Sequence, residues 1–245
     1  MSSSHDPKRN RLLAALLAED YARLLPDLEL TSMPLGWAVC EAGVPMEYVY
    51  FPTTCIISML YVMENGDSAE IAIIGNDGLV GVSVFMGGDS VSSRAVVQNA
   101  GECYRIKAKL LEKEFRRGGS LQQLALRFTQ TLIAQMVQTG ACNRHHTLEQ
   151  QLCRWLLLSL DRLRGNEVLM TQKLMANMLG VQRPGVAEAT RKLQKDGLIR
   201  YGNGRVNVLN RSNLEDRACE CYGVVRDEIE RLFAYKLPIP LRAVT

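Results

Sequence analysis

The stretch TQKLMANMLGVQRPGVAEATRKLQKDGLI, Thr171 to Ile199, decides how the fold is interpreted. Thr171 can act as the N-cap of a short helix over 172–179, and Gly180 suits the left-handed turn that must follow it. Pro184 fits the first turn of a second helix over 183–195, because its missing N–H would have no helical partner there. The pattern therefore predicts two short helices joined by a tight turn.

The two helices have distinct inner and outer faces. Small or apolar residues take the inward positions: Met175, Ala176, Leu179, Val181, Val186 and Ala189. The outward set on the second helix is Gln182, Arg183, Gly185, Ala187, Glu188 and Arg191. This arrangement is typical of a helix-turn-helix, whose second helix enters the major groove of DNA. A generic helical hairpin is the alternative.

Basic residues concentrate in this part of the chain. The 245-residue protein has a net charge of +3, and residues 1–120 carry 11 Lys+Arg against 15 Asp+Glu. Residues 171–211, in contrast, carry 8 Lys+Arg against 2 Asp+Glu. Such a block indicates a polyanionic partner, with a solvated basic face as the alternative.

Individual side chains can be given expected roles on DNA. Arg183 can form two hydrogen bonds to a guanine edge, and Gln182 and Glu188 are further candidates for base edges beside Gly185. The stretch LIRYGNGRVNVL predicts two strands around Asn203-Gly204, which would form a wing. The expected phosphate contacts are Lys173, Arg191, Lys192, Arg200 and Arg205. For each, a surface charge without a contact is the alternative.

The first half of the chain has a β texture. A helical period over residues 11–25 ends at Pro26, and short β-rich runs follow from about residue 30 to residue 106. Turn signals divide the runs EYVYF, CIISMLYVM, AEIAII, RAVVQ and ECYRI. They predict a small antiparallel barrel or β-roll, followed by a short helix in AKLLEKEFRRGG.

One long helix is predicted from Ser120 to about His145. It carries an apolar stripe and a second apolar flank of Leu126, Ile133 and Val137. A helix with two apolar sides is expected to pack on its own β domain with one and on a second subunit with the other. We assign the subunit interface to the stripe: Leu121, Leu124, Phe128, Leu132 and Met136. Burial of the whole helix within one chain is the alternative.

Two further helices complete the chain. Thr147 and Gln150 form a capping-box pattern before an amphipathic helix that ends at Gly165. The stretch from Ser212 to Pro238 predicts a single C-terminal helix, with Ser212 as its cap.

Composition narrows the class of protein. Apolar residues make up 47% and charged residues 22%, with no run of eighteen apolar residues and no secretion signal at the start. A cytoplasmic location without membrane contact is therefore expected. Seven scattered cysteines, without CxxC pairs, match neither a disulfide framework nor a zinc motif and predict buried small side chains. No nucleophile–base constellation, P-loop or HExxH occurs, so no enzymatic activity is expected.

The order of β-roll, long helix and winged helix-turn-helix resembles the Crp/Fnr superfamily of bacterial transcription regulators. Over about residues 15–215, the resemblance is carried by AGVPMEYVYF, DGLVG, the 121–145 helix and LMTQKLMANMLGVQRPGVAEATRKLQKDGLI. It implies an α+β chain: a jelly-roll sensor domain of the cyclic-nucleotide-binding type over 1–118, a dimerisation helix over 119–146, and a winged helix-turn-helix domain over 147–245. It also implies a homodimer on a palindromic operator of double-stranded DNA, with RNA polymerase as a further candidate partner.

The sequence departs from the cyclic-nucleotide-binding members of this family. There a Gly-Glu pair holds the ribose and an Arg before Ser/Thr-Ala holds the phosphate. Here Gly81 is followed by Val82, and Ser93 stands at the Arg position, with Arg94 on the opposite face of the strand. Without these charge-assisted bonds, weak or no cyclic-AMP binding is expected. The degenerate pocket comprises Gly81, Val82, Ser83, Ser93 and Arg94, and a local bulge that restores Arg94 is the alternative.

The residues that form the other sensor sites of this family are also absent from the expected positions of this sequence. No cysteine lies in residues 1–39, where iron–sulfur members carry their cluster, and none of the three histidines, His5, His145 and His146, lies in the roll. Cys142 is three and four residues from His145 and His146, which suits either a metal or redox site or a polar connection between domains. The Cys219-Glu220-Cys221 segment is interpreted as packing, so no metal or cofactor is assigned.

The leading hypothesis is a dimeric, sequence-specific transcription regulator that does not respond to cyclic AMP. Because Pro184 and Gly185 follow Arg183, and Glu188 replaces a later arginine of the family, its operator is expected to differ from the usual half-site. The alternative is a haem or redox sensor whose main activity is ligand binding.

Overall fold

Alternating apolar residues build an N-terminal β-roll. The computed structural model describes residues 5–88 and 90–235. Two antiparallel sheets, of order β1-β7-β3 and β2-β6-β4-β5, enclose a core that includes Phe51, Ile57 and Ile106. The strands are β1 (Glu29–Met33), β2 (Ala38–Cys40), β3 (Tyr48–Pro52), β4 (Ile56–Val62), β5 (Ser68–Ile74), β6 (Arg94–Asn99) and β7 (Gly101–Lys107). The five predicted runs are confirmed, and β1 and β2 add two strands that the sequence pattern does not predict.

Short helices flank the roll: α1 (Arg11–Ala14), α2 (Ala18–Leu24), α3 (Ser83–Met86) and α4 (Ala108–Arg116). The prediction of a single helix over residues 11–25 is wrong, because the helix is interrupted between α1 and α2. Leu17 is extended, and its N–H donates to Ser120 Oγ at 3.1 Å instead of to a helical carbonyl. This bond ties the N-terminal segment to the start of the long helix.

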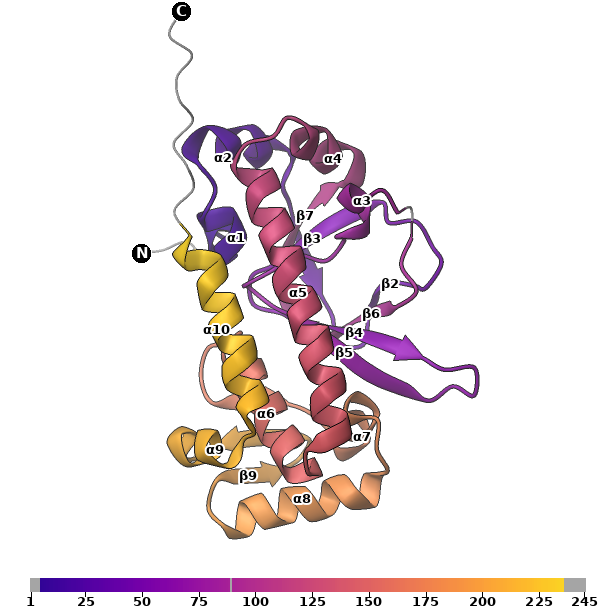
Figure 1. The fold of residues 1–245 in the computed structure, drawn as a ribbon, viewed down its shortest axis with the longest axis vertical. Coiled ribbons are helices and arrows are strands. Elements are labelled where there is room, and N and C mark those ends of the chain that lie inside the picture. Colours follow the sequence, from indigo (N-terminus) through magenta and orange to yellow (C-terminus); the bar gives the residue numbers. More distant parts are fainter. Residues whose placement is uncertain (1–4, 89, 236–245) are drawn as a thin grey trace, which may run out of the picture.

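The long helix α5 (Ser120–His145) has the predicted bounds. At 26 residues it is about 39 Å long, and it runs from the roll to the C-terminal domain (Figure 1). Within the described ranges, no helix is both long enough and apolar enough to cross a bilayer.

The C-terminal domain contains α6 (Leu148–Leu160), β8 (Glu167–Leu169), α7 (Gln172–Leu179), α8 (Arg183–Lys195), β9 (Ile199–Gly202), β10 (Arg205–Val208) and α9 (Arg211–Arg217). Its core gathers Leu156, Val186, Leu193 and Val206. The capping box of Thr147 and Gln150 is confirmed. The predicted two-stranded wing gains a third strand, since the sheet order is β8-β10-β9.

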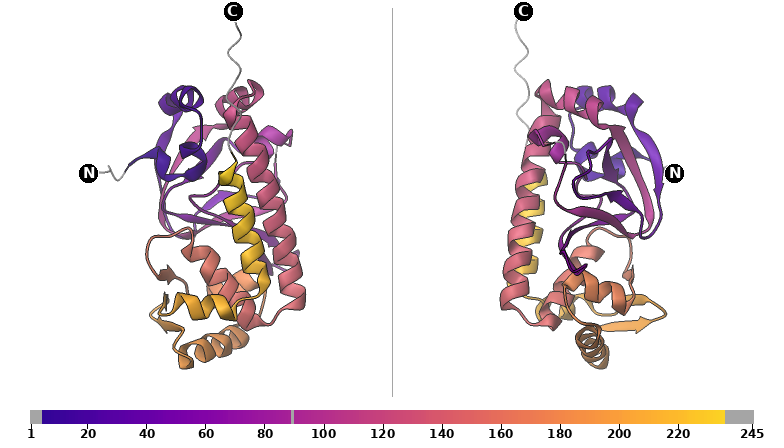
Figure 2. Two further views of the ribbon diagram at one scale, coloured as in Figure 1. Left: turned by 60° about the vertical axis from the view of Figure 1, so that its left-hand side comes forward. Right: turned by 90° about the vertical axis from the view of Figure 1, so that its right-hand side faces the viewer.

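The predicted C-terminal helix is two helices. Asn210, not Ser212, caps α9, and the backbone is extended at Ala218 and Cys219 before α10 (Glu220–Ala234) begins. The chain reverses there, so α10 runs back beside α5 toward the roll (Figures 1 and 2). Leu232 near its end joins the core of the roll, whereas Val225 joins the core of the C-terminal domain. The last helix thus packs on both domains.

Candidate nucleic-acid interface

The helix-turn-helix forms as the sequence predicts. Thr171 Oγ1 accepts a hydrogen bond from the Leu174 N–H at 3.2 Å and caps α7. Gly180 has φ +65°, a conformation that other residues adopt only with strain. At the entrance to α8, a Cβ on Gly185 would lie 3.0 Å from Leu148 Cδ2, so glycine allows α8 to approach α6 closely. The turn and this close approach fix how α8 is presented.

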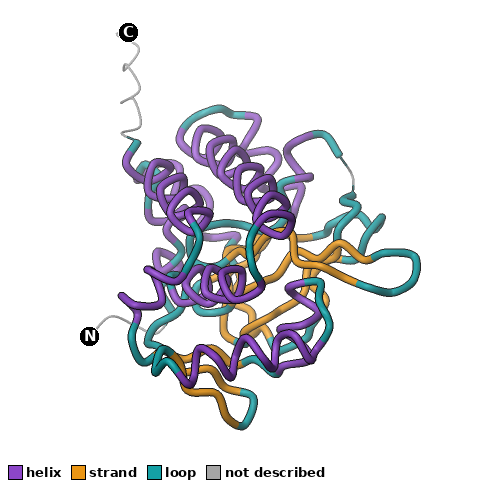
Figure 3. Tube along the Cα trace, turned by 60° about the horizontal axis from the view of Figure 1, so that its bottom comes forward, coloured by secondary structure: helices purple, strands orange, loops and turns teal. Residues whose placement is uncertain are grey.

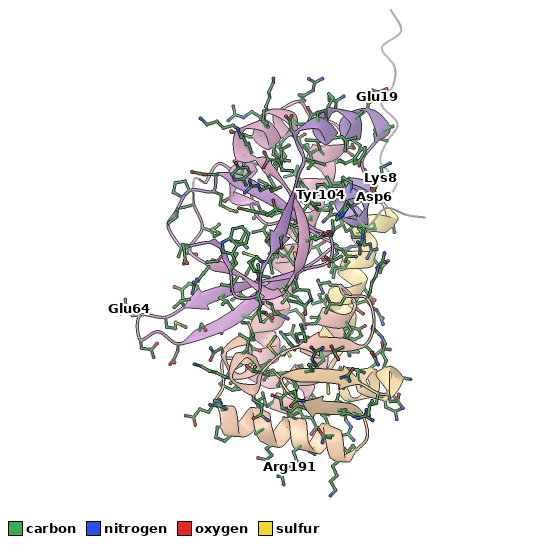
Figure 4. The ribbon with its side chains drawn as sticks, turned by 180° about the vertical axis from the view of Figure 1, so that it is seen from behind. Asp6, Lys8, Glu19, Glu64, Tyr104 and Arg191 are labelled. Atoms are coloured by element: carbon green, nitrogen blue, oxygen red, sulfur yellow. The ribbon has the colours of Figure 1, made fainter. Side chains whose placement is uncertain are left out.

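The exposed face of α8 carries the predicted contact residues. Val186, Ala189 and Leu193 face the core, whereas Arg183, Glu188 and Arg191 are exposed, as is Gln182 at the N-cap. The Gln182 side chain makes no capping hydrogen bond, which leaves it available for other partners. Arg191 points away from the body of the molecule (Figure 4). Lys195 lies four residues after Arg191 on the same exposed face. It is not among the predicted DNA contacts, although it is one of the 8 Lys+Arg residues in 171–211.

The predicted phosphate contacts fall into two groups. Among the described residues, no carboxylate forms an ion pair with Lys173, Arg191 or Arg200, and all three are exposed. Lys192 Nζ lies 2.6 Å from Glu149 Oε2, and Arg205 lies 2.6 Å from Glu167 Oε1. These two cations remain more than half exposed, but they would have to exchange or share an internal partner to reach a phosphate.

Glu149 links α6 to this surface. Burial alone would raise its pKa, but hydrogen bonds from Lys192 and Arg217 outweigh this effect, so the pKa of Glu149 is lowered. The same bond raises the pKa of Lys192. Nothing in the local sequence pattern marks Glu149, which is 43 residues from Lys192 in the chain.

The wing lies beside α8. Asn203 and Gly204 have φ of +51° and +70°, and β9 and β10 pair antiparallel on either side of them. Tyr201 Oη accepts a hydrogen bond from the Gln172 N–H at 3.2 Å, which ties the wing to the start of α7. Viewed with the lower end of the molecule forward, the hairpin projects next to α8 (Figure 3). Helix and wing therefore form one surface.

The assignment of the apolar stripe on α5 to a subunit interface is wrong. Leu121, Leu124, Phe128 and Leu132 are only 2–5% exposed and belong to the core of the roll, with Met136 packed against it. The second apolar flank is the one that faces solvent: Leu126, Ile133 and Val137 are 51%, 53% and 67% exposed. With Gln130 and Gly140, also exposed, these residues follow a heptad spacing of 4, 3, 4 and 3, and we call this set the α5 seam.

The residues predicted for the degenerate pocket surround very little space. Gly81, Val82 and Ser93 line a cavity of about 20 Å³ together with Ala95 and apolar side chains, among them Leu132 of α5. Such a volume holds about one water molecule. Arg94 is not among the lining residues: its Nε lies 3.1 Å from Glu41 Oε1 in an exposed ion pair. Ser83 lies nearby, buried, and its hydroxyl has no hydrogen-bond partner in the described part of the chain.

The structure also joins two cysteine groups that the sequence analysis treats separately. Cys142 and His146 at the end of α5 meet Cys219 and Cys221 at the start of α10, whereas His145 is exposed and outside the group.

Comparisons with known proteins agree with this architecture. Residues 31–117 match the model of the cyclic nucleotide-binding domain, and residues 150–217 match that of the Crp-like helix-turn-helix domain. No curated protein matches the chain.

Three solved structures illustrate the shared fold. A protein of Eubacterium rectale assigned to the Crp/Fnr family of transcriptional regulators has a TM-score of 0.66 at 14% identity, over 85% of this chain and 98% of that one. FixK2 from Bradyrhizobium japonicum has a TM-score of 0.65 at 17% identity, over 78% and 98%. TTHA1359 from Thermus thermophilus, a transcriptional regulator of the CRP/FNR family, has a TM-score of 0.59 at 18% identity, over 78% and 98%. With both domain models matched in the family's order, the chain belongs to the Crp/Fnr family of transcription regulators.

Proposed function

We propose that this protein is a homodimeric, sequence-specific DNA-binding regulator that does not respond to cyclic AMP. The observation that carries the proposal is the exposed face of α8, on which Arg183 and Arg191 have no carboxylate partner among the described residues. Cations held on the outside of a helix-turn-helix, next to a wing, match the shape and charge of a major groove and its phosphates.

The α5 seam supports a two-fold assembly. Pairing two such seams buries Leu126, Ile133 and Val137, which the single chain leaves in solvent. An isologous dimer presents two α8 helices, which read half-sites about 34 Å apart on one side of a duplex. The operator is therefore proposed to be a palindrome, and RNA polymerase a further partner in the cytoplasm.

The effector proposal follows from the pocket. A cyclic nucleotide requires a cation for its phosphate and several hundred cubic ångströms of space. The cavity at Ser93 offers about 20 Å³ and an apolar lining, while Arg94 is engaged with Glu41. Cyclic AMP would have to displace core side chains and break that ion pair.

Selection of binding sites from random duplex DNA tests the proposal. The full-length protein should enrich short palindromes and bind them with an affinity that falls steeply as salt rises. Calorimetric titration with cyclic AMP should give no heat of binding, and the ligand should leave DNA affinity unchanged. Enrichment of unrelated sequences would refute the DNA-reading role, and micromolar cyclic-AMP binding would refute the effector proposal separately.

A further inference from the structure

Three cysteine sulfurs and one imidazole, all potential metal ligands, meet where the long helix ends. Cys142 lies in the last turn of α5 and His146 is its C-cap, while Cys219 is the N-cap of α10 and Cys221 lies in its first turn. The three sulfur atoms and a ring nitrogen of His146 all lie within 4.8 Å of one another. All three cysteines are buried, and they form a separate small core of their own. The cluster lies outside the DNA-facing surface and the effector pocket.

The spacing of these atoms fits one tetrahedral ion. Cys142 Sγ and Cys219 Sγ are 3.5 Å apart, and Cys221 Sγ is 3.4 Å from His146 Nδ1. In a tetrahedral zinc site with zinc–sulfur bonds of about 2.3 Å, the sulfurs are about 3.8 Å apart. Small outward shifts would therefore make room for an ion. An iron–sulfur cluster would need several irons and bridging sulfides between cysteines that are here in contact.

The second ring nitrogen of His146 supplies an independent indication. His146 Nε2 lies 3.3 Å from Glu220 Oε1. Metal-bound histidines commonly donate their other N–H to a carboxylate, which orients the ring and fixes the tautomer. Here that contact leaves Nδ1 directed at Cys221. Gln138 Nε2 in turn donates to Cys221 Sγ at 3.0 Å, as an outer partner of a thiolate ligand would.

A buried cation balances the charge that such a site would carry. Three thiolates and a neutral imidazole around a divalent ion leave one net negative charge. Arg154 is 4% exposed, forms no ion pair among the described residues, and has a buried Nε without a hydrogen-bond partner. Its guanidinium donates to Thr139 Oγ1 at 3.2 Å, one turn before Cys142 in α5.

We propose that Cys142, His146, Cys219 and Cys221 bind a single zinc-class ion that ties the end of α5 to the start of α10. Cys3His is a closed ligand set of the structural kind, with no position left for substrate. The ion joins the helix that carries the α5 seam to the segment that follows α9 of the C-terminal domain. It thereby fixes the direction in which the domain carrying α8 leaves α5.

Metal uptake by the full-length protein tests the proposal without DNA. Protein kept under a thiol reductant and freed of metal with a chelator is titrated with Co²⁺ and then with Zn²⁺. We expect one Co²⁺ per chain, thiolate-to-cobalt charge-transfer absorption, the visible bands of tetrahedral Co²⁺, and loss of colour when Zn²⁺ displaces it. Elemental analysis of the untreated protein should give one zinc per chain.

Matched variants separate ligands from neighbours. His146→Ala and Cys219→Ala should abolish the tetrahedral cobalt spectrum, whereas His145→Ala and Cys153→Ala should retain it. Glu220→Gln changes an exposed side chain and should leave the fold intact, and it should weaken Zn²⁺ binding by about 10-fold or more. Uptake below one ion per chain, an unchanged spectrum in His146→Ala, or iron with inorganic sulfide in the untreated protein would each overturn the single-ion site.

Discussion

The guanidinium of Arg162 lies 2.8 Å from a carboxylate oxygen of Asp77, in an ion pair whose side chains are 2% and 8% exposed. Asp77 belongs to the turn after β5 of the roll, and Arg162 follows α6 of the C-terminal domain. A Cβ on Gly75 would lie 2.6 Å from Arg162 Cβ, so glycine is required where the arginine enters. This buried pair joins the two domains.

Replacing Asp77 by Ala should therefore destabilise the protein by about 3–5 kcal/mol, because it leaves a buried guanidinium without its counter-charge. Denaturant-induced unfolding measures the change. The control is Glu29→Ala, which breaks the more exposed pair with Arg105 and should cost no more than about 1 kcal/mol. Equal losses in the two variants would contradict an interdomain role for the buried pair.

Glu70 should make stability depend on pH. Burial raises its pKa to about 7, although hydrogen bonds from Ser58 and Trp155 act in the opposite direction. Between about pH 4.5 and pH 7 the folded protein then holds a proton that the unfolded chain releases. Stability contributed by this group is therefore full below that window, falls as pH rises through it, and stays constant above it.

Glu70→Gln should remove this slope, which amounts to about 3 kcal/mol at most. Trp155 can still donate to the amide oxygen, and Ser58 can accept from the amide nitrogen. Unfolding free energies measured from pH 5 to pH 8 test the expectation, with Glu64→Gln at the exposed hairpin tip (Figure 4) as the control. If wild type and Glu70→Gln keep a constant difference, Glu70 is not the titrating group.

Arg183→Ala should weaken binding to the selected operator by about 1–3 kcal/mol and relax selection at one base of each half-site. Lys173→Ala should instead weaken binding to all sequences equally and reduce the salt dependence by about one phosphate contact. Fluorescence anisotropy over a salt series distinguishes the two patterns. Lys113→Ala, an exposed cation on α4 at the other end of the molecule, should bind as wild type does. Unchanged selectivity in Arg183→Ala would remove that residue from base readout.

Ile133→Glu should convert a dimer to a monomer, because it places a charge in the α5 seam while leaving the fold intact. Native mass spectrometry reports the subunit count, and operator binding should drop with it. Leu35→Glu changes a similarly exposed leucine in the roll and should leave the dimer unaffected. A dimer that persists in Ile133→Glu would place the interface elsewhere.

How far the sequence predicts this protein depends on how local each signal is. Thr171, Gly180 and Asn203-Gly204 act within a few residues of themselves, so the bounds of α7, α8 and the wing follow from capping and left-handed turns. The helix break at Leu17 depends on Ser120, which is 103 residues away, and no local pattern reveals it.

The wrong interface assignment at α5 and the unpredicted contact between the cysteines have the same origin. Periodicity shows that α5 has two apolar sides, but only the folded roll determines that Phe128 faces inward and Ile133 outward. Cys142 and Cys219 are 77 residues apart, and their contact requires the reversal at Ala218 that turns α10 back along α5. Contacts that only the tertiary structure creates cannot be predicted from the spacing of residues in the sequence.

The return of α10 has a mechanical consequence. Two antiparallel helices, α5 and α10, span the distance between the roll and the C-terminal domain. A single connecting helix would let the two domains pivot about its end, whereas two packed helices oppose such a rotation. Any reorientation of the domain that carries α8 would require one helix to slide along the other, and packed helices tolerate only small displacements of that kind. Signals would then reach DNA as a shift of about an ångström or two along the α5–α10 contact, not as a wide swing.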